Sequence, residues 1–440
     1  SPCEYDHVET DINSWHFYLD NFEQAKEHVK KVVENTYPGS PFNYAEGWKQ
    51  ETAPLINSEY GGVSAGSGDR DISWVFLFLT NLLRRYDKIC GYVYTELEDI
   101  EWEHNGFLNY DRSEKEFHYP AGITVADLQQ PDFPVLDVPP YIEFAPDGKV
   151  LSIPVLISHW SEKRDLSVRL TAHGETVDGE PWNKWISPQQ KEVHAQPYSV
   201  ASLGTFEFEI PARKGLLFLV AEVMEKDRRI AANYCAVNVL GRAFDHADKV
   251  RCLSFRVNEY ESSTFESLYC ENGKDKLWAY GSGSLTYRVD IPNEAINRKI
   301  KRAYFICEVG SKADAERLDW PERRRPDDYP QTDRKKWPTD ILIALENCVL
   351  FNSTVRDDYA DARGVLSHAL EFHHGSHGEV IKVDLDGESL KALEKAIGEK
   401  RNLVIRFEVP NNAQHKGGIS LYGENMGMMP LDPTLVLEFE

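Results

Sequence analysis

The chain has 440 residues, and at about 150 residues per domain this length predicts several domains instead of one. Its 49 basic and 72 acidic residues give a net charge of −23; this charge would repel a phosphate backbone and argues against a nucleic-acid partner. Hydrophobic residues make up 41% and charged residues 28% of the chain, values typical of globular domains, so a wholly disordered chain is excluded.

The sequence gives no indication of a membrane partner. The longest apolar run, residues 74–83, is interrupted by Thr80 and Asn81 and is shorter than the roughly 18 apolar residues that a membrane helix needs. The seven cysteines are scattered and form no Cys-x-x-Cys pair. This pattern is typical of reduced thiols and favours a reducing compartment such as the cytoplasm.

The first part of the chain alternates between strand and helix periods. Residues 7–12, 54–58 and 89–95 read as strands, and residues 22–33 and 72–86 have helical spacing. Strand, helix, strand, helix, strand is the pattern of a parallel sheet. The long loops follow the carboxyl ends of the strands, which in a (β/α)₈ barrel form the catalytic face.

After this segment the pattern changes to β. Residues 120–140 are rich in proline and read as a linker, and alternating runs then predict a β-sandwich. A second, larger sandwich or jelly roll follows, with a short helix at residues 389–397. The predicted domains are therefore residues 1–130, 131–241 and 242–440.

The sharpest local motif is Pro-Leu-Ile-Asn-Ser-Glu-Tyr-Gly-Gly, residues 54–62. It puts the carboxyl group of Glu59 directly at the end of an apolar strand, where burial is costly unless the group is paired or used. The two glycines after it allow a sharp turn. Glu59 is therefore a candidate catalytic group; the alternative is a glutamate that ends a strand in solvent or caps a helix.

Two further clusters fall on the same predicted face. Residues 91–106 read Gly-Tyr-Val-Tyr-Thr-Glu-Leu-Glu-Asp-Ile-Glu-Trp-Glu-His-Asn-Gly, and residues 13–18 read Asn-Ser-Trp-His-Phe-Tyr. Aromatic rings interleaved with carboxylates suit a sugar, whose CH faces stack on rings while its hydroxyl groups need acceptors. The acidic residues from Glu96 to Glu103 equally fit a solvated loop or a cation site.

These motifs together carry a resemblance to a known family. Residues 10–18, 57–62 and 91–106 resemble the end of the catalytic barrel of glycoside hydrolase family 2, which includes β-galactosidases, β-glucuronidases and β-mannosidases. The resemblance spans roughly residues 3–119. It implies a multidomain fold in which the last three strands of a (β/α)₈ TIM barrel precede two all-β sandwich or jelly-roll domains.

The resemblance also implies site residues. The glutamate before Tyr-Gly is the nucleophile of a retaining mechanism in the family, which assigns that role to Glu59. The remaining implied residues would lie around the sugar: His16, Tyr18, Tyr94, Glu96, Asn105 and Trp102. Of these, Trp102 fits a sugar platform and a packed loop tryptophan equally well.

One required group is missing from the motifs. A retaining glycosidase needs a second carboxyl group about 5–5.5 Å from the nucleophile, and in the family this group follows an asparagine on the fourth strand. No Asn-Glu pair precedes Glu59. We therefore expect a C-terminal portion that is inactive alone, complemented by the missing N-terminal part or a partner subunit, and a homo-oligomer when complete. The alternative is a noncatalytic carbohydrate-binding or subunit-bridging piece.

The expected substrate is a glycoside with a terminal, neutral, β-linked sugar. The Asn-x-Lys pair with which β-glucuronidases read a uronic acid is absent, since Asn109 is followed by Tyr110 and Asp111. No cofactor or tightly bound metal is expected, because His373, His374 and His377 lack a carboxylate at ligand spacing. Loosely bound Mg²⁺ or Na⁺ on loop carboxylates remains open.

Overall fold

The computed structural model describes residues 6–61, 72–101, 103, 105–244, 249–270, 275–311, 338–356, 364–367 and 377–440. The chain forms two compact units: residues 1–212 and 217–241 make up most of the first, and residues 242–328 and 333–440 most of the second. Most elements are β-strands and few are helices. The expectation of β-sandwich domains is confirmed at this level, and the three-part division at residues 130 and 241 remains a prediction.

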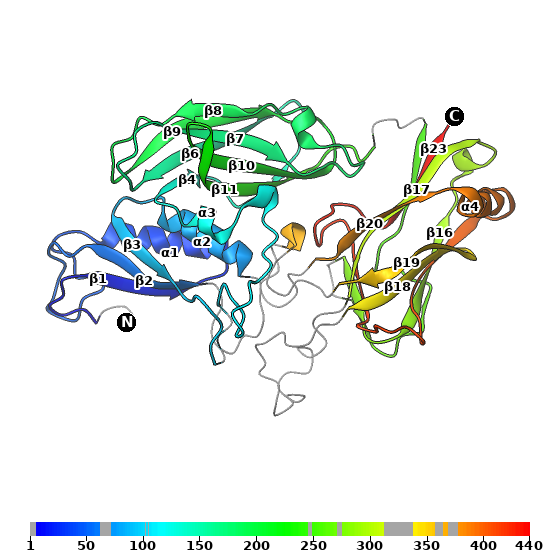
Figure 1. The fold of residues 1–440 in the computed structure, drawn as a ribbon, viewed down its shortest axis with the longest axis horizontal. Helices are drawn as coiled ribbons and strands as arrows, with labels where there is room; N and C mark the ends of the chain where they lie inside the picture. The colour runs from blue at the N-terminus through cyan, green and yellow to red at the C-terminus, as the bar shows by residue number, and fades with distance from the viewer. Residues whose placement is uncertain are drawn as a thin grey trace. The chain divides into compact units, whose positions relative to one another are not determined.

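The first unit begins with a parallel sheet of three strands, β1 (Asn13–Tyr18), β2 (Leu55–Gly61) and β3 (Ile89–Tyr94), in the order β1-β2-β3. The helices α1 (Phe22–Asn35) and α2 (Ser73–Leu83) connect them and lie on one face of the sheet (Figure 1). The strand-helix alternation expected from the sequence is confirmed. The (β/α)₈ barrel remains a prediction.

The position of the first strand differs from the prediction. Residues 7–12 form no strand apart from an isolated bridge at His7, and β1 occupies residues 13–18 instead. Within β1, Trp15 and Phe17 are buried and their rings contact that of His28 on α1. This alternation of buried rings, which the sequence analysis assigned to the loop after the strand, anchors the strand to the helix.

Both predicted helices are present. Asn21 caps α1, because its side chain accepts a hydrogen bond from the backbone N–H of Gln24 at 3.1 Å. In α2, every residue from Ser73 to Leu83 is buried, whereas helical spacing of the apolar residues predicts burial of one face. The reason lies in the sandwich of the same unit, which covers the face of α2 that does not contact its own sheet.

That contact overturns the predicted linker. Residues 120–140 contain a short turn of helix at Pro120–Gly122, the helix α3 (Val125–Leu128) and the strand β4 (Asp132–Leu136). Every residue of β4 is buried. The prolines misled the prediction because Pro134 lies on an edge strand, which tolerates the missing N–H group.

The first sandwich has two sheets. One contains β4, β6 (Val150–His159) and β9 (Ser199–Glu209). The other has five strands in the order β5 (Tyr141–Phe144), β11 (Arg228–Val239), β10 (Gly215–Glu225), β7 (Leu166–His173) and β8 (Gln189–Glu192). Aliphatic residues from both sheets form one buried cluster around Trp182, so the predicted sandwich is confirmed.

The second unit is a larger sandwich. One sheet contains β12 (Val250–Ser254), β23 (Thr434–Phe439), β17 (Ile300–Gly310), β22 (Ile419–Tyr422), β15 (Lys276–Ala279), β14 (Leu268–Cys270) and β20 (Glu379–Leu385). The other contains β13 (Ser262–Ser263), β16 (Gly283–Asp290), β21 (Asn402–Val409), β18 (Thr339–Leu345) and β19 (Cys348–Val355). The short helix expected near residue 390 is α4 (Gly387–Glu399).

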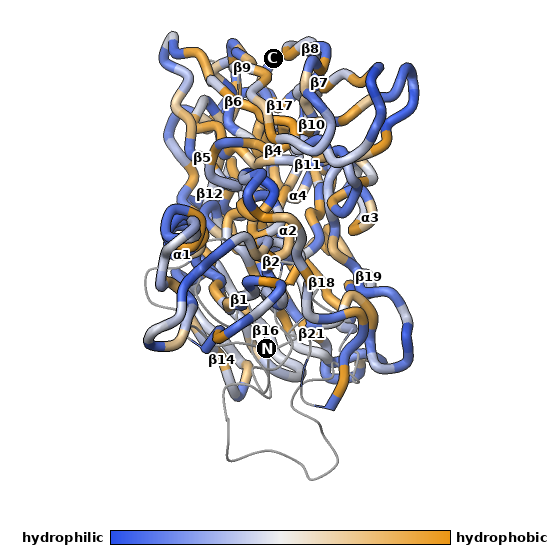
Figure 2. The backbone as a smooth tube through the Cα atoms, turned by 90° about the vertical axis from the view of Figure 1, so that its left-hand side faces the viewer, coloured by the Kyte–Doolittle hydropathy of each residue, from blue (hydrophilic) through white to orange (hydrophobic). Residues whose placement is uncertain are grey.

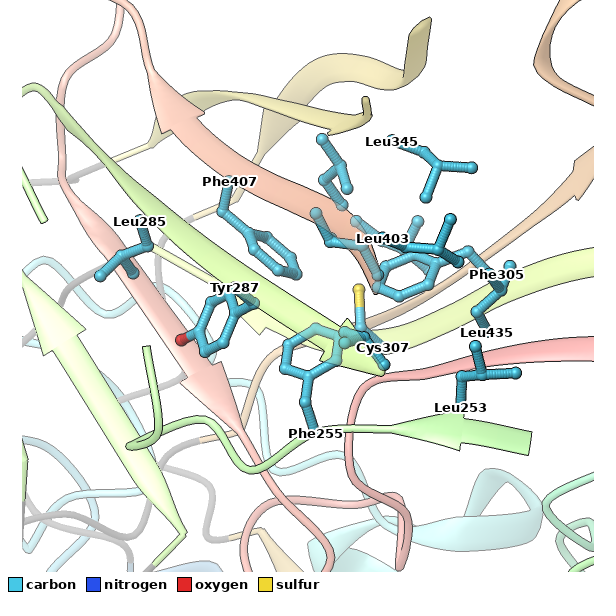
Figure 3. Close-up of a cluster of buried hydrophobic side chains, with 14 of the residues drawn as sticks. Leu253, Phe255, Leu285, Tyr287, Phe305, Cys307, Leu345, Leu403, Phe407 and Leu435 are labelled. Atoms are coloured by element: carbon cyan, nitrogen blue, oxygen red, sulfur yellow. The ribbon is translucent and has the colours of Figure 1, made fainter. Parts of the chain in front are cut away.

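The core of this sandwich is aromatic and aliphatic. Phe255, Tyr287 and Phe407 pack ring against ring between the sheets, with Phe305 beside them (Figure 3). Along the backbone, hydrophobic and hydrophilic stretches alternate (Figure 2). Among the described residues, no helix has the length and apolar character needed to cross a membrane.

Candidate functional site

The candidate site lies where the three parallel strands of the first unit end. In the register of the sheet, His16 of β1 is the direct partner of Glu59 of β2. On the other side, Tyr60 of β2 is the partner of Tyr94 at the end of β3. The carboxyl ends of all three strands therefore meet at one edge, and the sequence clusters around His16, Glu59 and Glu96 converge there.

A β-bulge in β2 decides which way Glu59 faces. The register shifts between Trp15 and His16, so that Trp15 pairs with Asn57 but His16 pairs with Glu59, and Ser58 is the extra residue. Strict alternation would put Glu59 on the same face as Asn57, toward the helices. The inserted residue reverses this order. Glu59 thus lies on the face of His16, opposite the helices.

Side chains of the same motif stabilise the bulge. The backbone carbonyl of Trp15 accepts hydrogen bonds from Asn57 Nδ2 and from Ser58 Oγ, both at 3.1 Å. Asn57 is fully buried, and its Oδ1 atom has no hydrogen-bond partner among the described residues. The residues before the glutamate therefore hold the irregular backbone that orients it.

Tyr60 faces the helices and completes this turn of the strand. Its hydroxyl group lies 2.7 Å from Oγ1 of Thr80 on α2, and its ring packs edge-on against Tyr92 and Tyr94. Burial raises the pKa of the Tyr60 hydroxyl far above its ordinary value. Tyr60 is therefore a neutral packing residue that fixes the orientation of its neighbour Glu59.

Tyr94, predicted to line the sugar subsite, lies in an aromatic cluster. Its ring stacks on Phe107 at 4.5 Å and meets Phe76 of α2 edge-on at 5.0 Å. Its hydroxyl group donates a hydrogen bond to the backbone carbonyl of Asn105 at 2.8 Å. Through this bond the end of β3 holds Asn105, a residue that is 2% exposed, close to the strand end.

Glu96 follows β3 and is half-buried at the same edge. Its Oε1 atom is buried and has no hydrogen-bond partner in the described part of the chain. Burial, together with the nearby charges of Glu103, Asp99 and Glu59 and against the opposing charge of Lys115, raises the pKa of Glu96 to about 7. A carboxyl group with this pKa is partly protonated at neutral pH and can donate as well as accept a hydrogen bond.

The acidic segment after β3 is a folded loop with a buried ion pair inside it. Lys115 Nζ lies 3.0 Å from Asp99 Oδ1, and the two side chains are 1% and 3% exposed. At the surface, Arg112 pairs with Glu98 at 2.6 Å. The sequence left two alternatives open for this segment, a solvated loop or a cation site. At Asp99 the structure shows neither, because this carboxylate pairs with a lysine of the same chain.

The other predicted residues divide as follows. His16 and Tyr18 lie on the same face of β1 with ring centroids 6.1 Å apart, and Tyr18 is 39% exposed. Trp102 lies outside the described residues. Of the three histidines that the sequence did not favour as metal ligands, His377 is buried and its Nδ1 atom is 3.0 Å from the backbone carbonyl of Gly378, while His373 and His374 lie outside the described residues.

Asp99, Lys115, Asn57 and Ser58 were not singled out by the sequence analysis. Lys115 stands in an acidic stretch, but pairs within a loop follow neither strand nor helix spacing, so no periodicity links it to Asp99. For the bulge, the available signal is the polar pair Asn57-Ser58 inside an apolar strand. Such a pair indicates that the strand is locally irregular.

No protein-family model matches the chain, and no curated protein matches it. Among solved structures, it is similar to a calcium-binding mutant of β-glucuronidase 2 from Bacteroides uniformis, with 15% identity and a TM-score of 0.23, over 94% of this chain and 45% of that one. It is also similar to a β-glucuronidase from Parabacteroides merdae, with 12% identity and a TM-score of 0.25, over 90% of this chain and 39% of that one.

A third similar structure is a β-porphyranase of glycoside hydrolase family 86 from Bacteroides plebeius, with 10% identity and a TM-score of 0.19, over 98% of this chain and 63% of that one. The chain spans less than half the length of either β-glucuronidase. The assignment of a function to this chain therefore rests on the residues of the site.

Proposed function

We propose that the chain contributes the nucleophile of a retaining exo-β-glycosidase that removes terminal, neutral, β-linked sugars, and that Glu59 is this nucleophile. The observation that carries the proposal is the bulge at Ser58, which turns Glu59 to the face of its register partner His16. A strand irregularity whose effect is to present one carboxylate at the carboxyl end of a parallel sheet is typical of a catalytic position.

The chemistry would proceed in two displacements. A carboxylate oxygen of Glu59 attacks the anomeric carbon as the glycosidic bond breaks, and the leaving oxygen takes a proton from an acid. The product is a glycosyl ester of Glu59. The same acid, now a base, removes a proton from water, which attacks the anomeric carbon and regenerates the free carboxylate of Glu59.

The second carboxyl group would come from further β/α units. Both outer strands of the described sheet, β1 and β3, have an open edge, and parallel sheets normally have partners that bury them on both faces. The proposed partner, part of the same enzyme or another subunit, pairs with these edges and completes a (β/α)₈ barrel of the family 2 type. A homo-oligomer of the completed enzyme is part of the same proposal.

Sugar hydroxyl groups would contact the oxygens that are left open at the strand ends. Glu96 Oε1 and Asn105 Oδ1 are buried and have no hydrogen-bond partner among the described residues, and such atoms favour a polar ligand. His16 and Tyr18 would flank Glu59 from β1, and Trp102 keeps its proposed place in the wall of the subsite. Tyr94, whose ring contacts Phe76 of α2, would support this wall from behind through its hydrogen bond to Asn105. No cofactor is part of this proposal.

Charge favours a neutral sugar over a uronic acid. The described cations of the loop, Arg112 and Lys115, already have carboxylate partners in Glu98 and Asp99. A uronate would therefore meet an acidic site without a free cation from this pair, and like charges at short range oppose binding.

Covalent labelling tests the proposal without the missing acid. A dinitrophenyl β-galactoside with fluorine beside the anomeric carbon has a leaving group that needs no protonation, so the first displacement by Glu59 does not require the missing acid. We expect one sugar per chain, on the peptide that contains Glu59, and none in Glu59→Gln. Labelling of Glu96 or Glu101 instead rejects the assignment of Glu59 as the nucleophile. No labelling with a panel of neutral β-sugars also rejects it and favours the noncatalytic carbohydrate-binding alternative.

A further inference from the structure

The loop that follows β3 is folded around one carboxylate. Asp99 Oδ1 accepts a hydrogen bond from Lys115 Nζ and another from the backbone N–H of Gly106, both at 3.0 Å. The backbone N–H of Asp99 donates to the carbonyl of Leu108 at 3.0 Å. Asp99 thus links three segments of the loop that are separated in sequence.

Gly106 makes this close approach possible. A Cβ atom at this position would collide with backbone atoms of Glu98 and Asp99. Backbone hydrogen bonds also join Glu96 to the opposite side of the loop. The N–H of Glu96 donates to the carbonyl of Asn105 at 3.5 Å, and the N–H of Phe107 donates to the carbonyl of Glu96 at 3.3 Å. Glu96 and Asn105 are therefore held by the same folded segment that contains the buried ion pair.

We propose that Asp99 and Lys115 are positioning residues of the site: their buried ion pair fixes the loop that presents Glu96 and Asn105 at the strand end beside Glu59. This inference rests on the proposed function for the identity of the ligand, a sugar hydroxyl group. It assigns the two residues a role through Glu96, with no contact of their own to the sugar.

The two members of the pair also act on the charge of Glu96, in opposite directions. The groups that act on Glu96 are Glu103, Asp99 and Lys115 of its own loop and Glu59 of β2. Lys115 is the single cation among them. Loss of the lysine charge leaves Glu96 among carboxylates and favours its protonated form, whereas loss of the Asp99 charge favours its ionised form. A protonated Glu96 donates a hydrogen bond to a hydroxyl oxygen, and an ionised one only accepts.

The proposal can be tested because loss of the Lys115 charge and loss of the Asp99 charge should shift the pKa of Glu96 in opposite directions. In the full chain labelled at the glutamate carboxyl carbons, carbon NMR follows the titration of Glu96, whose signal is identified by its loss in Glu96→Gln. We expect Lys115→Met to raise the titration midpoint and Asp99→Asn to lower it, each by about half a pH unit or more. Lys115→Arg should keep the native midpoint, because it keeps the charge.

The neutral pair Asp99→Asn with Lys115→Met separates charge from packing. Because the two opposite contributions cancel, its midpoint should return close to the native value. Shifts of the same sign in the two single variants, or no shift in either, overturn the proposal, since a pair that only fills space would affect Glu96 alike in both. If a single variant does not fold, Lys115→Arg and the neutral pair still decide: a displaced midpoint in both overturns the proposal.

Labelling of Glu59 distinguishes this inference from the proposed function. Opposite midpoint shifts without any labelling of the native chain would sink the glycosidase assignment and leave the positioning role intact. Labelling of the native chain, together with an unmoved Glu96 midpoint in the variants, would overturn the positioning role and leave the glycosidase assignment intact. With both correct, Lys115→Met should slow the labelling of Glu59, and Lys115→Arg should restore it.

Discussion

Asn81 of α2 and Asn233 of β11 meet side chain to side chain inside the first unit, where Asn233 Nδ2 donates a hydrogen bond to Asn81 Oδ1 at 2.8 Å. Asn81 also exchanges hydrogen bonds with the backbone of Leu136 on β4, donating to its carbonyl at 2.9 Å and accepting from its N–H at 3.0 Å. One buried amide therefore ties the helix behind the candidate site to both sheets of the sandwich.

Replacement of this amide should destabilise the first unit. We expect Asn81→Leu to lower its free energy of unfolding by about 2–4 kcal/mol, because it leaves the buried N–H and carbonyl of Leu136 without these partners. Urea unfolding followed by tryptophan fluorescence measures the change. Asn35→Leu, at an exposed position of α1 where the side chain donates to Lys31, is the matched control and should change stability by less than about 1 kcal/mol. Equal effects of the two variants would contradict the role of Asn81.

The pKa of Glu96 predicts a pH-dependent gain of stability on its replacement. Folding raises this pKa from 4.5 to about 7, so between these values the folded state binds more protons than the unfolded state, and stability falls as pH rises. Glu96→Gln removes the charge. We expect the melting temperature of the variant, relative to the native chain, to be higher at about pH 8 than at about pH 5.

The exposed Glu34 of α1 provides the control for this experiment. Glu34→Gln should show no comparable change between the two pH values, since its charge lies on the solvent side of the helix. A melting-temperature difference for Glu96→Gln that is constant with pH, or that declines as pH rises, would argue against a raised pKa in the native chain.

Periodicity in the sequence predicted those elements whose burial follows one regular pattern. Helix α1 has buried residues at Ala25, Val29, Val32 and Val33, and these spacings are what the sequence displays. Helix α2 was predicted from the sequence as a helix, but its burial on all sides was not. Its second buried face contacts strands that lie more than forty residues later in the chain, as in the bond from Asn81 to Leu136, and local periodicity contains no information about that contact.

The candidate site was predictable in its location but not in its geometry. The motif around Glu59 indicated a functional strand end, and Glu59 is indeed the register partner of His16 at the end of its strand. A strict two-residue alternation would have turned Glu59 toward the helices, so the bulge at Ser58 had to come from the structure. The pairing of Asp99 with Lys115 is likewise a tertiary contact within a loop, set by backbone folding and not by spacing.

In the second unit, a buried carboxylate should be as important for stability as the aromatic core. Glu308 of β17 is fully buried and accepts hydrogen bonds from the backbone N–H groups of Gly378 at 3.0 Å, Met428 at 2.9 Å and Met429 at 2.8 Å. We expect Glu308→Gln to lower the free energy of unfolding of this unit by about 3 kcal/mol, because an amide N–H₂ would face backbone N–H groups. Urea unfolding checks this.

Two variants bracket the result at Glu308. Gly427→Ala should also destabilise the unit, because a Cβ atom there would collide with the Glu308 carboxylate and Gly427 has a φ of +75°. Glu294→Gln, at an exposed position of the same unit, should be nearly neutral. If neither Glu308→Gln nor Gly427→Ala changes the free energy of unfolding, the backbone segments at Gly378 and at Met428 and Met429 do not depend on the Glu308 carboxylate.

The bulge that orients Glu59 should depend on the side chains that bind the Trp15 carbonyl. In the double variant Asn57→Ala with Ser58→Ala, this carbonyl loses two hydrogen bonds of 3.1 Å, so the bulge relaxes and Glu59 shifts from its reacting position. We expect the rate of Glu59 labelling by the fluoro-β-galactoside to fall by about 10- to 100-fold, since displacement of a reacting group by about 1 Å has an effect of this size. Ser14→Ala, on β1 one residue before Trp15, is the matched serine control and should label at the native rate. Native labelling by the double variant would mean that the backbone alone maintains the bulge.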